Sequence, residues 1–140
     1  TGRILSQYNV GAQTRRTPNS LWFDEDRLDI HPHDAAERGI ADGDWVGVAS
    51  RAGQTVLRAR VTESMQPGVV WTTFHFPESG ANVITTDSSD WATNCPEYKV
   101  TAVQVSKVIQ PSDWQRRFAA FDREQQALLA QARQTEVVGK

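Results

Sequence analysis

The stretch DGDWVGVASRAGQTVLRARV, residues 42–61, carries two turn signals, and each is followed by the pattern of a β-strand. Asp42-Gly43 and Ala52-Gly53 are dipeptides that favour tight turns. After the second turn, apolar and charged side chains alternate, with Arg58 and Arg60 on one side of the pattern. This period of two is typical of a strand with one solvent-exposed face. We therefore predict strands over residues 45–48 and 56–61.

Turn signals and strand patterns continue on both sides of this stretch. Pro67-Gly68 is a third turn signal, and the apolar run at 69–74 suits a strand that is buried on both faces. Residues 100–105 are rich in β-branched side chains and predict the closing strand. Upstream, residues 33–38 suit a short helix that Gly39 would end in a left-handed cap. Strands separated by tight turns, with one short helix, indicate a small closed β-barrel.

Two segments of different character flank this barrel. Residues 1–23 are mostly polar, and they predict an ordered loop or an arm laid on a partner, in which only Ile4-Leu5 suits a short strand. Pro111 ends the last strand, and Ser112 or Asp113 can cap a helix that runs to about Arg133. The helix has an interrupted apolar face made of Trp114, Phe118, Phe121, Leu128 and Leu129. Such a helix packs on its own domain or joins a neighbour.

Composition excludes several classes of protein. A chain of 140 residues supports one domain with a real core. It has 15 Lys and Arg against 17 Asp and Glu, and the resulting net charge of −2 argues against nucleic-acid binding. No apolar run is long enough to cross a bilayer, so we predict no membrane association. Because the chain starts at Thr1 rather than at a methionine, we expect it to be a piece of a longer protein.

The sequence gives little support for a catalytic cysteine. Cys95 could pair with His75 as nucleophile and base, but nothing in their spacing requires it. A lone cysteine is more often a small buried hydrophobe, which is the prediction here. As the only cysteine, Cys95 cannot form an internal disulfide, and this fits a reducing, cytoplasmic location.

The sequence gives no better support for a metal site or for a phosphate-binding loop. His31 and His33 would share a face of a strand, yet the further ligands that a metal site needs are missing. The acidic cluster at 24–26 predicts a solvated loop. The chain also lacks the glycine patterns that cradle phosphates. We therefore predict no catalytic and no metal-ligating residues in this segment.

Ligand binding is better supported. The stretch TGRILSQYN at the start of the chain is rich in side-chain donors and acceptors, and Gly11 and residues 14–16 extend it. Hydroxyls, amides and arginine forks in one stretch suit an anionic, planar ligand. On composition alone, however, an exposed amino-terminal arm is the simpler interpretation.

A second polar stretch lies between the two last predicted strands, from about residue 74 to residue 99. Its polar groups are at 75, 80–82, 85–87 and 96–99, and it has little apolar content. Long ordered connections in compact domains tend to carry function. The alternative is that each polar group only stabilises the loop.

Several pieces of the sequence, in this order, resemble a known family: TGRIL at 1–5, TRR at 14–16, HDA at 33–35, GI at 39–40, DGD at 42–44, SR at 50–51, PGVV at 67–70, Asn82 and PEYK at 96–99. The pattern resembles the molybdopterin dinucleotide-binding domain that ends the large subunit in the dimethyl-sulfoxide-reductase superfamily. FHF at 74–76, Asn82 and PEYK are most similar to formate dehydrogenases, and periplasmic nitrate reductases share Asn82 and Tyr98-Lys99. Asp90-Trp91 departs from the Asp-Pro that usually opens this loop.

The resemblance implies a mainly β fold, a six-stranded double-psi barrel with short helices over residues 1–108, and an amphipathic carboxy-terminal helix within residues 109–140. It also implies bis-(molybdopterin guanine dinucleotide) with molybdenum or tungsten as cofactor. The residues that it assigns to cofactor binding are Arg3, Ile4, Leu5, Ser6, Gln7, Tyr8, Asn9, Gly11, Thr14, His75, Asn82, Tyr98 and Lys99. The metal ligand and the formate-handling residues belong to earlier parts of such a subunit, so Cys95 is not that ligand.

Roles follow from the resemblance and from the chemistry of the side chains. Arg3 and Lys99 would place positive charge near the pyrophosphate, while Ser6, Asn9, Thr14 and Asn82 would bind guanine or pterin edges. For this to work, the amino-terminal stretch and the Asn82–Lys99 connection must converge in space. The sequence thus predicts a cofactor-binding domain for formate oxidation to carbon dioxide.

The same resemblance predicts the partners. They are the remaining domains of the large subunit, and iron–sulfur and NAD-reducing subunits, because the helical tail resembles the extension on NAD-linked formate dehydrogenases. Two alternatives stay open. One is the same domain in a nitrate reductase or another molybdopterin oxidoreductase, and the other is a free-standing double-psi barrel that serves as an interaction module.

Overall fold

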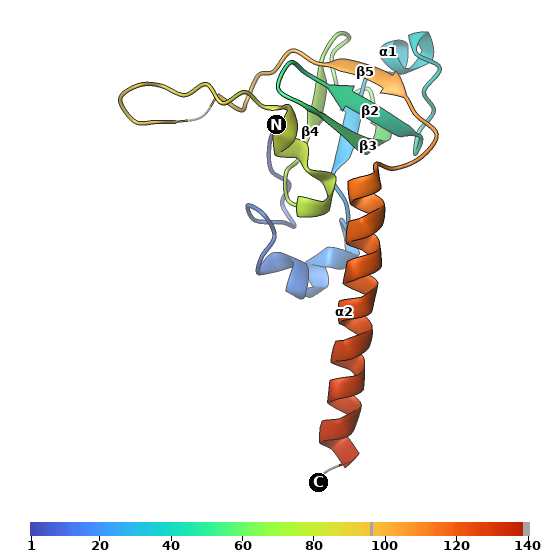
Figure 1. Ribbon diagram of the computed structural model, residues 1–140. Helices are drawn as coiled ribbons and strands as arrows, with labels where there is room; N and C mark the ends of the chain where they lie inside the picture. The colour runs from blue at the N-terminus through green and yellow to red at the C-terminus, as the bar shows by residue number, and fades with distance from the viewer. Residues whose placement is uncertain (96, 139–140) are drawn as a thin grey trace.

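A curled five-stranded sheet forms the body of the protein (Figure 1). The computed structural model describes residues 1–95 and 97–138. The strands lie in the order β4-β1-β3-β2-β5, and their bounds are β1 (Arg27–Ile30), β2 (Trp45–Ala49), β3 (Gln54–Val61), β4 (Val70–Thr72) and β5 (Gln104–Lys107). The mainly β, barrel-type fold predicted from the sequence is confirmed, although the sheet of the described residues has five strands rather than the predicted six.

The stretch 42–61 folds as its pattern predicts. β2 and β3 pair antiparallel, and the turn at 50–53 joins them. Side chains alternate along β3, so that Thr55, Leu57 and Ala59 are buried while Arg58 and Arg60 are only partly covered. Leu57 lies in the core cluster with Leu28, Ile30, Val46, Val48 and Val105. Full burial of such aliphatic side chains contributes about 1.5–3 kcal/mol each, and this one face holds the sheet together.

β1 joins the sheet beside β3 rather than beside its sequence neighbour β2. The two strands run parallel, and α1 (Pro32–Glu37) and β2 form the crossover between them. Gly39 ends α1 with φ +62, so the predicted left-handed cap is confirmed. The register places Asp29 opposite Arg60, and the Arg60 Nε donates to Asp29 Oδ1 at 2.7 Å. This hydrogen bond to Asp29 raises the pKa of Arg60.

The sheet departs from the prediction at its edges. Ile4-Leu5 does not form a strand; the arm instead meets the sheet through one parallel bridge, Gly2 to Thr73, beyond the end of β4. The run 69–74 contains only a three-residue strand, and beyond it the backbone amides of His75 and Phe76 donate to a buried carboxylate instead of to a neighbouring strand. The last strand starts at Gln104 rather than at residue 100, and the segment before it lines a cavity.

The long helix α2 (Asp113–Val138) follows β5 and projects away from the barrel (Figure 1). Ser112 caps it as predicted: its Oγ accepts from Gln115 N at 3.2 Å, and Gln115 Oε1 accepts from Ser112 N at 2.9 Å. Gln115 Nε2 also donates to the carbonyl of Val56 at 2.6 Å, which fixes the first turn on β3. In the described part of the chain, neither α2 nor any other helix combines the length and apolar character needed to traverse a bilayer.

Candidate functional site

A buried carboxylate organises the region where the amino-terminal stretch meets the barrel. Asp26 is 2% exposed and stands at the entrance to β1. Its oxygens accept from the amides of His75 and Phe76, both at 3.0 Å, from Ser79 Oγ at 2.5 Å, and from the Thr73 hydroxyl. A buried carboxylate is tolerated when its acceptor sites are filled in this way. The predicted solvated loop at 24–26 is therefore wrong for Asp26, which fixes the segment 73–79.

His75 links the segment 73–79 to the amino-terminal arm, residues 1–23. Its side chain is fully buried, and both ring nitrogens meet backbone groups of the arm. Ile4 N donates to Nε2 at 3.2 Å, and Nδ1 is hydrogen-bonded to the carbonyl of Asn9. One imidazole therefore closes the turn that runs from Ile4 to Asn9.

The interior of the arm is braced by its own polar side chains. Thr14 Oγ1 donates to Gln7 Oε1 at 2.7 Å and accepts from Tyr8 N at 3.1 Å. Gln7 is 4% exposed, and its Nε2 donates to the carbonyl of Phe23 at 3.4 Å. Gly11 has φ +69 and packs against Arg15 and the carbonyl of His75. The arm is therefore a folded loop rather than a loose extension.

Two arginines tie the arm's surface to the segment after β4. Arg3 donates through Nη2 to Asn9 Oδ1 at 3.0 Å and stacks over the ring of Phe74. Arg15 stacks over Phe76 and pairs with Glu78, with an Nη1–Oε2 distance of 3.0 Å. Because Arg3 is exposed and bonded to a neutral amide, its charge stays available to an anion.

Ser6 is the exception in this bonded loop. Its side chain is 3% exposed, and within the described residues its hydroxyl is the single buried side-chain polar atom without a hydrogen-bond partner. Leaving such a group unsatisfied costs about 1–3 kcal/mol. A polar ligand group that reached the hydroxyl would remove this cost.

The connection from η4 (Ala81–Ile84) to Lys99 is built differently, from local contacts. Asp90 Oδ1 accepts from Thr93 N at 2.7 Å and from Ala92 N at 3.0 Å, and Asp90 Oδ2 accepts from Cys95 N at 3.0 Å. The hydroxyl of Thr93 donates to the same carboxylate. Together these donors, the Thr93 hydroxyl first, lower the pKa of Asp90 to about 2. The loop extends away from the sheet in Figure 1 and exposes Trp91.

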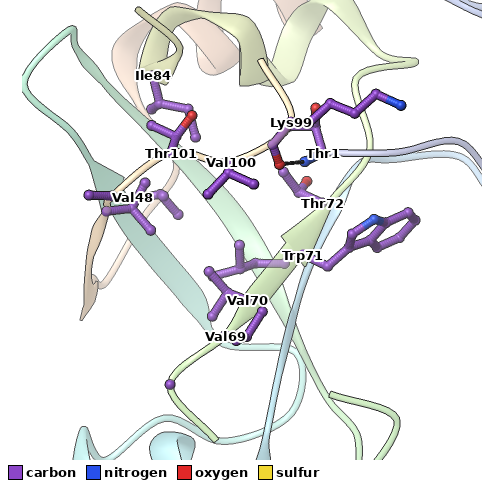
Figure 2. A pocket seen from close by; sticks show the side chains of 14 residues that line it. Thr1, Val48, Val69, Val70, Trp71, Thr72, Ile84, Lys99, Val100 and Thr101 are labelled. Carbon is purple, nitrogen blue, oxygen red and sulfur yellow. Dashed lines mark hydrogen bonds between the residues drawn. The ribbon is translucent and has the colours of Figure 1, made fainter. Parts of the chain in front are cut away.

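The two stretches meet at the first residue of the arm. The backbone nitrogen of Thr1 donates to the carbonyl of Lys99 at 3.2 Å (Figure 2). Thr1 Oγ1 also donates to the carbonyl of Tyr98 at 2.8 Å. A cavity of about 380 Å³ lies beside this junction, with a largely aliphatic lining that includes Val48, Val70 and Val100. The side chain of Lys99 points away from that lining in Figure 2, toward solvent.

Most of the predicted cofactor residues fall into two groups. Gln7, Asn9, Thr14 and His75 are engaged in holding the arm together, and Gly11 provides its left-handed turn. The side chains that face solvent are Arg3, Leu5, Tyr8, Asn82 and Lys99. Asn82 lies on η4, and hydrogen bonds from Thr1 join Tyr98 and Lys99 to the arm.

Sequence reasoning missed Asp26 and Ser79 as parts of this region, and it placed Arg15 in the polar stretch without foreseeing its pair with Glu78. Ser79 donates to Asp26, and Arg15 pairs with Glu78, so all three hold the segment 73–79 in place. One signal was available: Asp26 directly precedes a strand pattern, and a carboxylate at the end of a strand can meet backbone donors.

The remaining candidates have other positions. Cys95 is exposed, not buried as predicted. His31 caps α1 by accepting from His33 N at 3.1 Å. Ligand atoms of His33, Asp34 and Glu37 lie within 4.8 Å of one another. Asp34 already accepts from Gly68 N at 2.7 Å, and this bond, with Arg38 nearby, lowers the pKa of Asp34.

Comparison with known proteins identifies the class. Residues 1–102 match the model of the family described as "Molydopterin dinucleotide binding domain", and the chain belongs to this family. The chain aligns with acetylene hydratase from Pelobacter acetylenicus at a TM-score of 0.64 and 17% identity, over 76% of this chain and 17% of that one, which supports the fold alone.

Several curated proteins are similar to this chain and carry more specific names than the family. The alpha subunit of F420-dependent formate dehydrogenase 1 from Methanococcus maripaludis is 39% identical over 109 residues, which are 77% of this chain and 16% of that protein. The corresponding subunit from Methanocaldococcus jannaschii is 40% identical over the same shares. A nitrate reductase from Symbiobacterium thermophilum is 40% identical over 112 residues, 76% of this chain and 15% of the relative. The chain thus spans about a sixth of the length of these proteins. The first two names specify F420 and give no support to the predicted NAD linkage.

The residues present fit a pterin dinucleotide. Its pyrophosphate needs cationic donors, and Arg3 and Lys99 supply exposed ones on the two stretches that meet at Thr1. Its purine and pterin edges need amides, hydroxyls and backbone groups, and Asn82, the unpaired Ser6 hydroxyl and the folded arm supply these. When bound, the cofactor would supply the redox chemistry, and this chain would hold and orient it.

Proposed function

We propose that this chain is the cofactor-binding domain of a formate dehydrogenase large subunit, and that it helps to hold bis-(molybdopterin guanine dinucleotide) for the oxidation of formate to carbon dioxide. Membership of the dinucleotide-binding family and the two formate dehydrogenase relatives support this proposal. The observation that carries it is the junction of the two predicted stretches, where Thr1 bonds to the carbonyls of Tyr98 and Lys99.

Each group would have its own role. The exposed Arg3 and Lys99 would neutralise the pyrophosphate, and such charge-assisted bonds contribute about 1.5–3 kcal/mol each when partly buried. Asn82 and the Ser6 hydroxyl would bind the guanine or pterin edges. Leu5 and Tyr8, which point outward from the braced arm, would cover the planar rings, while the backbone of Ile4 and Gly11 would approach the ligand closely. The catalytic residues would lie elsewhere in the subunit.

The proposed domain division follows the predicted one, residues 1–108 and 109–140. β5 ends at Lys107 and the family match ends at residue 102, and both observations support a boundary before Pro111. Helix α2 would be an extension for contacts with other parts of a multi-subunit enzyme. The proposed partners are the rest of the large subunit and iron–sulfur subunits that carry electrons to the acceptor in the cytoplasm.

Cofactor content of the intact protein tests the assignment. Lys99→Ala combined with Asn82→Ala removes two exposed side chains, so the fold should persist while the pterin dinucleotide and the molybdenum or tungsten fall at least fivefold. Metal is measured by mass spectrometry and pterin by its fluorescent oxidation product. Arg117→Ala with Gln110→Ala is the matched control, since both are exposed and lie outside residues 1–102. Unchanged content in the Lys99–Asn82 variant would contradict the assignment.

Substrate choice needs a separate assay, because the nitrate reductase relative supports a second candidate. Formate-dependent reduction of benzyl viologen by the intact protein would support formate oxidation. Nitrate-dependent oxidation of reduced viologen would support the nitrate reductase instead. Assays with NAD and with F420 then decide between the acceptor predicted from the helical tail and the one in the relatives' names. A protein without any pterin would be an interaction module.

A further inference from the structure

His75 is placed to shape the cofactor site without touching the cofactor. Its side chain is fully buried, and the arm covers it. Because Ile4 N can only donate, Nε2 must be the acceptor, so the ring's hydrogen is on Nδ1 and is donated to the carbonyl of Asn9. Both ring nitrogens are thereby used by backbone groups of the arm, and neither is left for a ligand.

The segment that carries the His75 ring is also held in place. The backbone amide of His75 donates to Asp26 at 3.0 Å, and the next amide, that of Phe76, donates to the same carboxylate at 3.0 Å. The ring also packs against Phe74, with 5.4 Å between centroids. A buried acid thus fixes the backbone that carries the imidazole, and the imidazole fixes the arm.

The turn that His75 closes carries the groups assigned to the ligand. Asn9, at its end, has φ 44, a left-handed conformation that non-glycine residues rarely adopt, and its side chain holds Arg3. Leu5 is fully exposed and Tyr8 largely so. The position of all these groups depends on the closed turn.

We propose that His75 is a positioning residue: one neutral imidazole, hydrogen-bonded at both nitrogens, holds the Ile4–Asn9 turn in the shape that receives the dinucleotide. This inference rests on the proposed function. It replaces the direct cofactor contact predicted for His75 with an action through the arm. Loss of the ring's hydrogen bonds should therefore loosen a turn to which His75 is not adjacent in sequence.

Three substitutions separate the two hydrogen bonds. His75→Phe keeps a ring and removes both. His75→Gln keeps an acceptor that reaches Ile4 N, and His75→Asn keeps a donor near the Asn9 carbonyl but lacks that reach. His31→Phe is the matched control, because His31 also accepts a backbone N–H through a ring nitrogen, but on α1.

Hydrogen–deuterium exchange of the intact protein, read at the Ile4 amide, is the direct measurement. We expect exchange at Ile4 to rise at least tenfold in His75→Phe and His75→Asn and to stay within threefold in His75→Gln and His31→Phe. Amides of the β2–β3 pair report whether the domain stays folded. If His75→Phe does not fold, the Gln and Asn variants decide, and equal exchange at Ile4 in these two overturns the proposal.

Cofactor content links the turn to the ligand. Molybdenum or tungsten and pterin should fall at least fivefold in His75→Phe and be largely restored in His75→Gln. The turnover per bound metal should change less than twofold, since His75 does not meet the reacting atoms. Faster exchange at Ile4 with full cofactor content would overturn the positioning role. An unmodified protein without any pterin dinucleotide would instead refute the proposed function, and the Ile4 result would still decide whether His75 closes the turn.

Discussion

The arm and the Asp90 loop, which is the connection from η4 to Lys99, meet at Thr1, and they are ordered by opposite means. The arm is held by side chains that are distant in sequence, chiefly Asp26 and His75, which are 2% and 0% exposed. The loop is held by one exposed carboxylate, Asp90, whose donors lie within five residues of it. Long-range buried contacts fix a position relative to the sheet, whereas local contacts fix only a shape. We therefore expect damage to the first set to spread and damage to the second set to stay local.

Asp26→Ala should have the largest effect. It leaves two backbone amides and two hydroxyls without their buried acceptor. The free energy of unfolding should fall by more than about 3 kcal/mol. Urea or thermal unfolding of the protein measures this, and Asp24→Ala, at an exposed neighbour, should change it by less than about 0.5 kcal/mol. Equal effects in the two variants would place Asp26 at the surface and contradict its buried position.

Gly11→Ala should have an intermediate effect on the arm. Gly11 has φ +69, and a Cβ there would lie 2.6 Å from the Arg15 side chain and 3.0 Å from the carbonyl of His75. Backbone strain and crowding together should cost about 1–3 kcal/mol. Gly39→Ala is the control, because φ is +62 but nothing lies within 4 Å of the added Cβ. Gly39→Ala should therefore be the milder of the two, and the reverse order would show that the arm is not packed as described.

Acidification should have the smallest and most local effect, on the Asp90 loop. The pKa of Asp90 is lowered to about 2, because the Thr93 hydroxyl and the amides favour the ionised carboxylate. A lowered pKa means that the carboxylate's contribution is complete above its ordinary pKa of about 4 and is lost as the pH falls toward about 2. Exchange protection of the amides of Ala92, Thr93 and Cys95, corrected for intrinsic rates, should drop over this range.

Asp90→Asn sharpens the same comparison. At neutral pH it should reduce protection at those three amides while protection at Ile4 and in the β2–β3 pair stays unchanged. Loss of protection in the arm as well would mean that the arm and the Asp90 loop are coupled more tightly than their contacts indicate.

Much of the fold could be predicted because its signals are local. The Asp42-Gly43 turn signal indicated β2, the alternation after Ala52-Gly53 indicated β3, and Gly39 indicated the end of α1. Ser112 indicated the start of α2. The family resemblance, confirmed over residues 1–102, came from the order of short pieces of sequence.

The hydrogen bonds of Asp26 and His75 could not be predicted, because their partners are far apart along the chain. Asp26 lies in an acidic cluster that is typical of solvated loops, and only the folding of residues 73–79 around it makes it buried. Likewise, Ile4-Leu5 has the composition of a strand, but His75 draws this segment into a turn. Local composition carries no information about either event.

Helix α2 has a mechanical consequence. Its 26 residues make a rod of about 39 Å, and its first turn is bound to the barrel, where Gln115 Nε2 donates to the carbonyl of Val56. The helix is therefore anchored on β3 near its amino-terminal end. A fluorophore or crosslinker attached near its tip would stand well clear of the arm and would survey the surroundings of the extension without disturbing the dinucleotide.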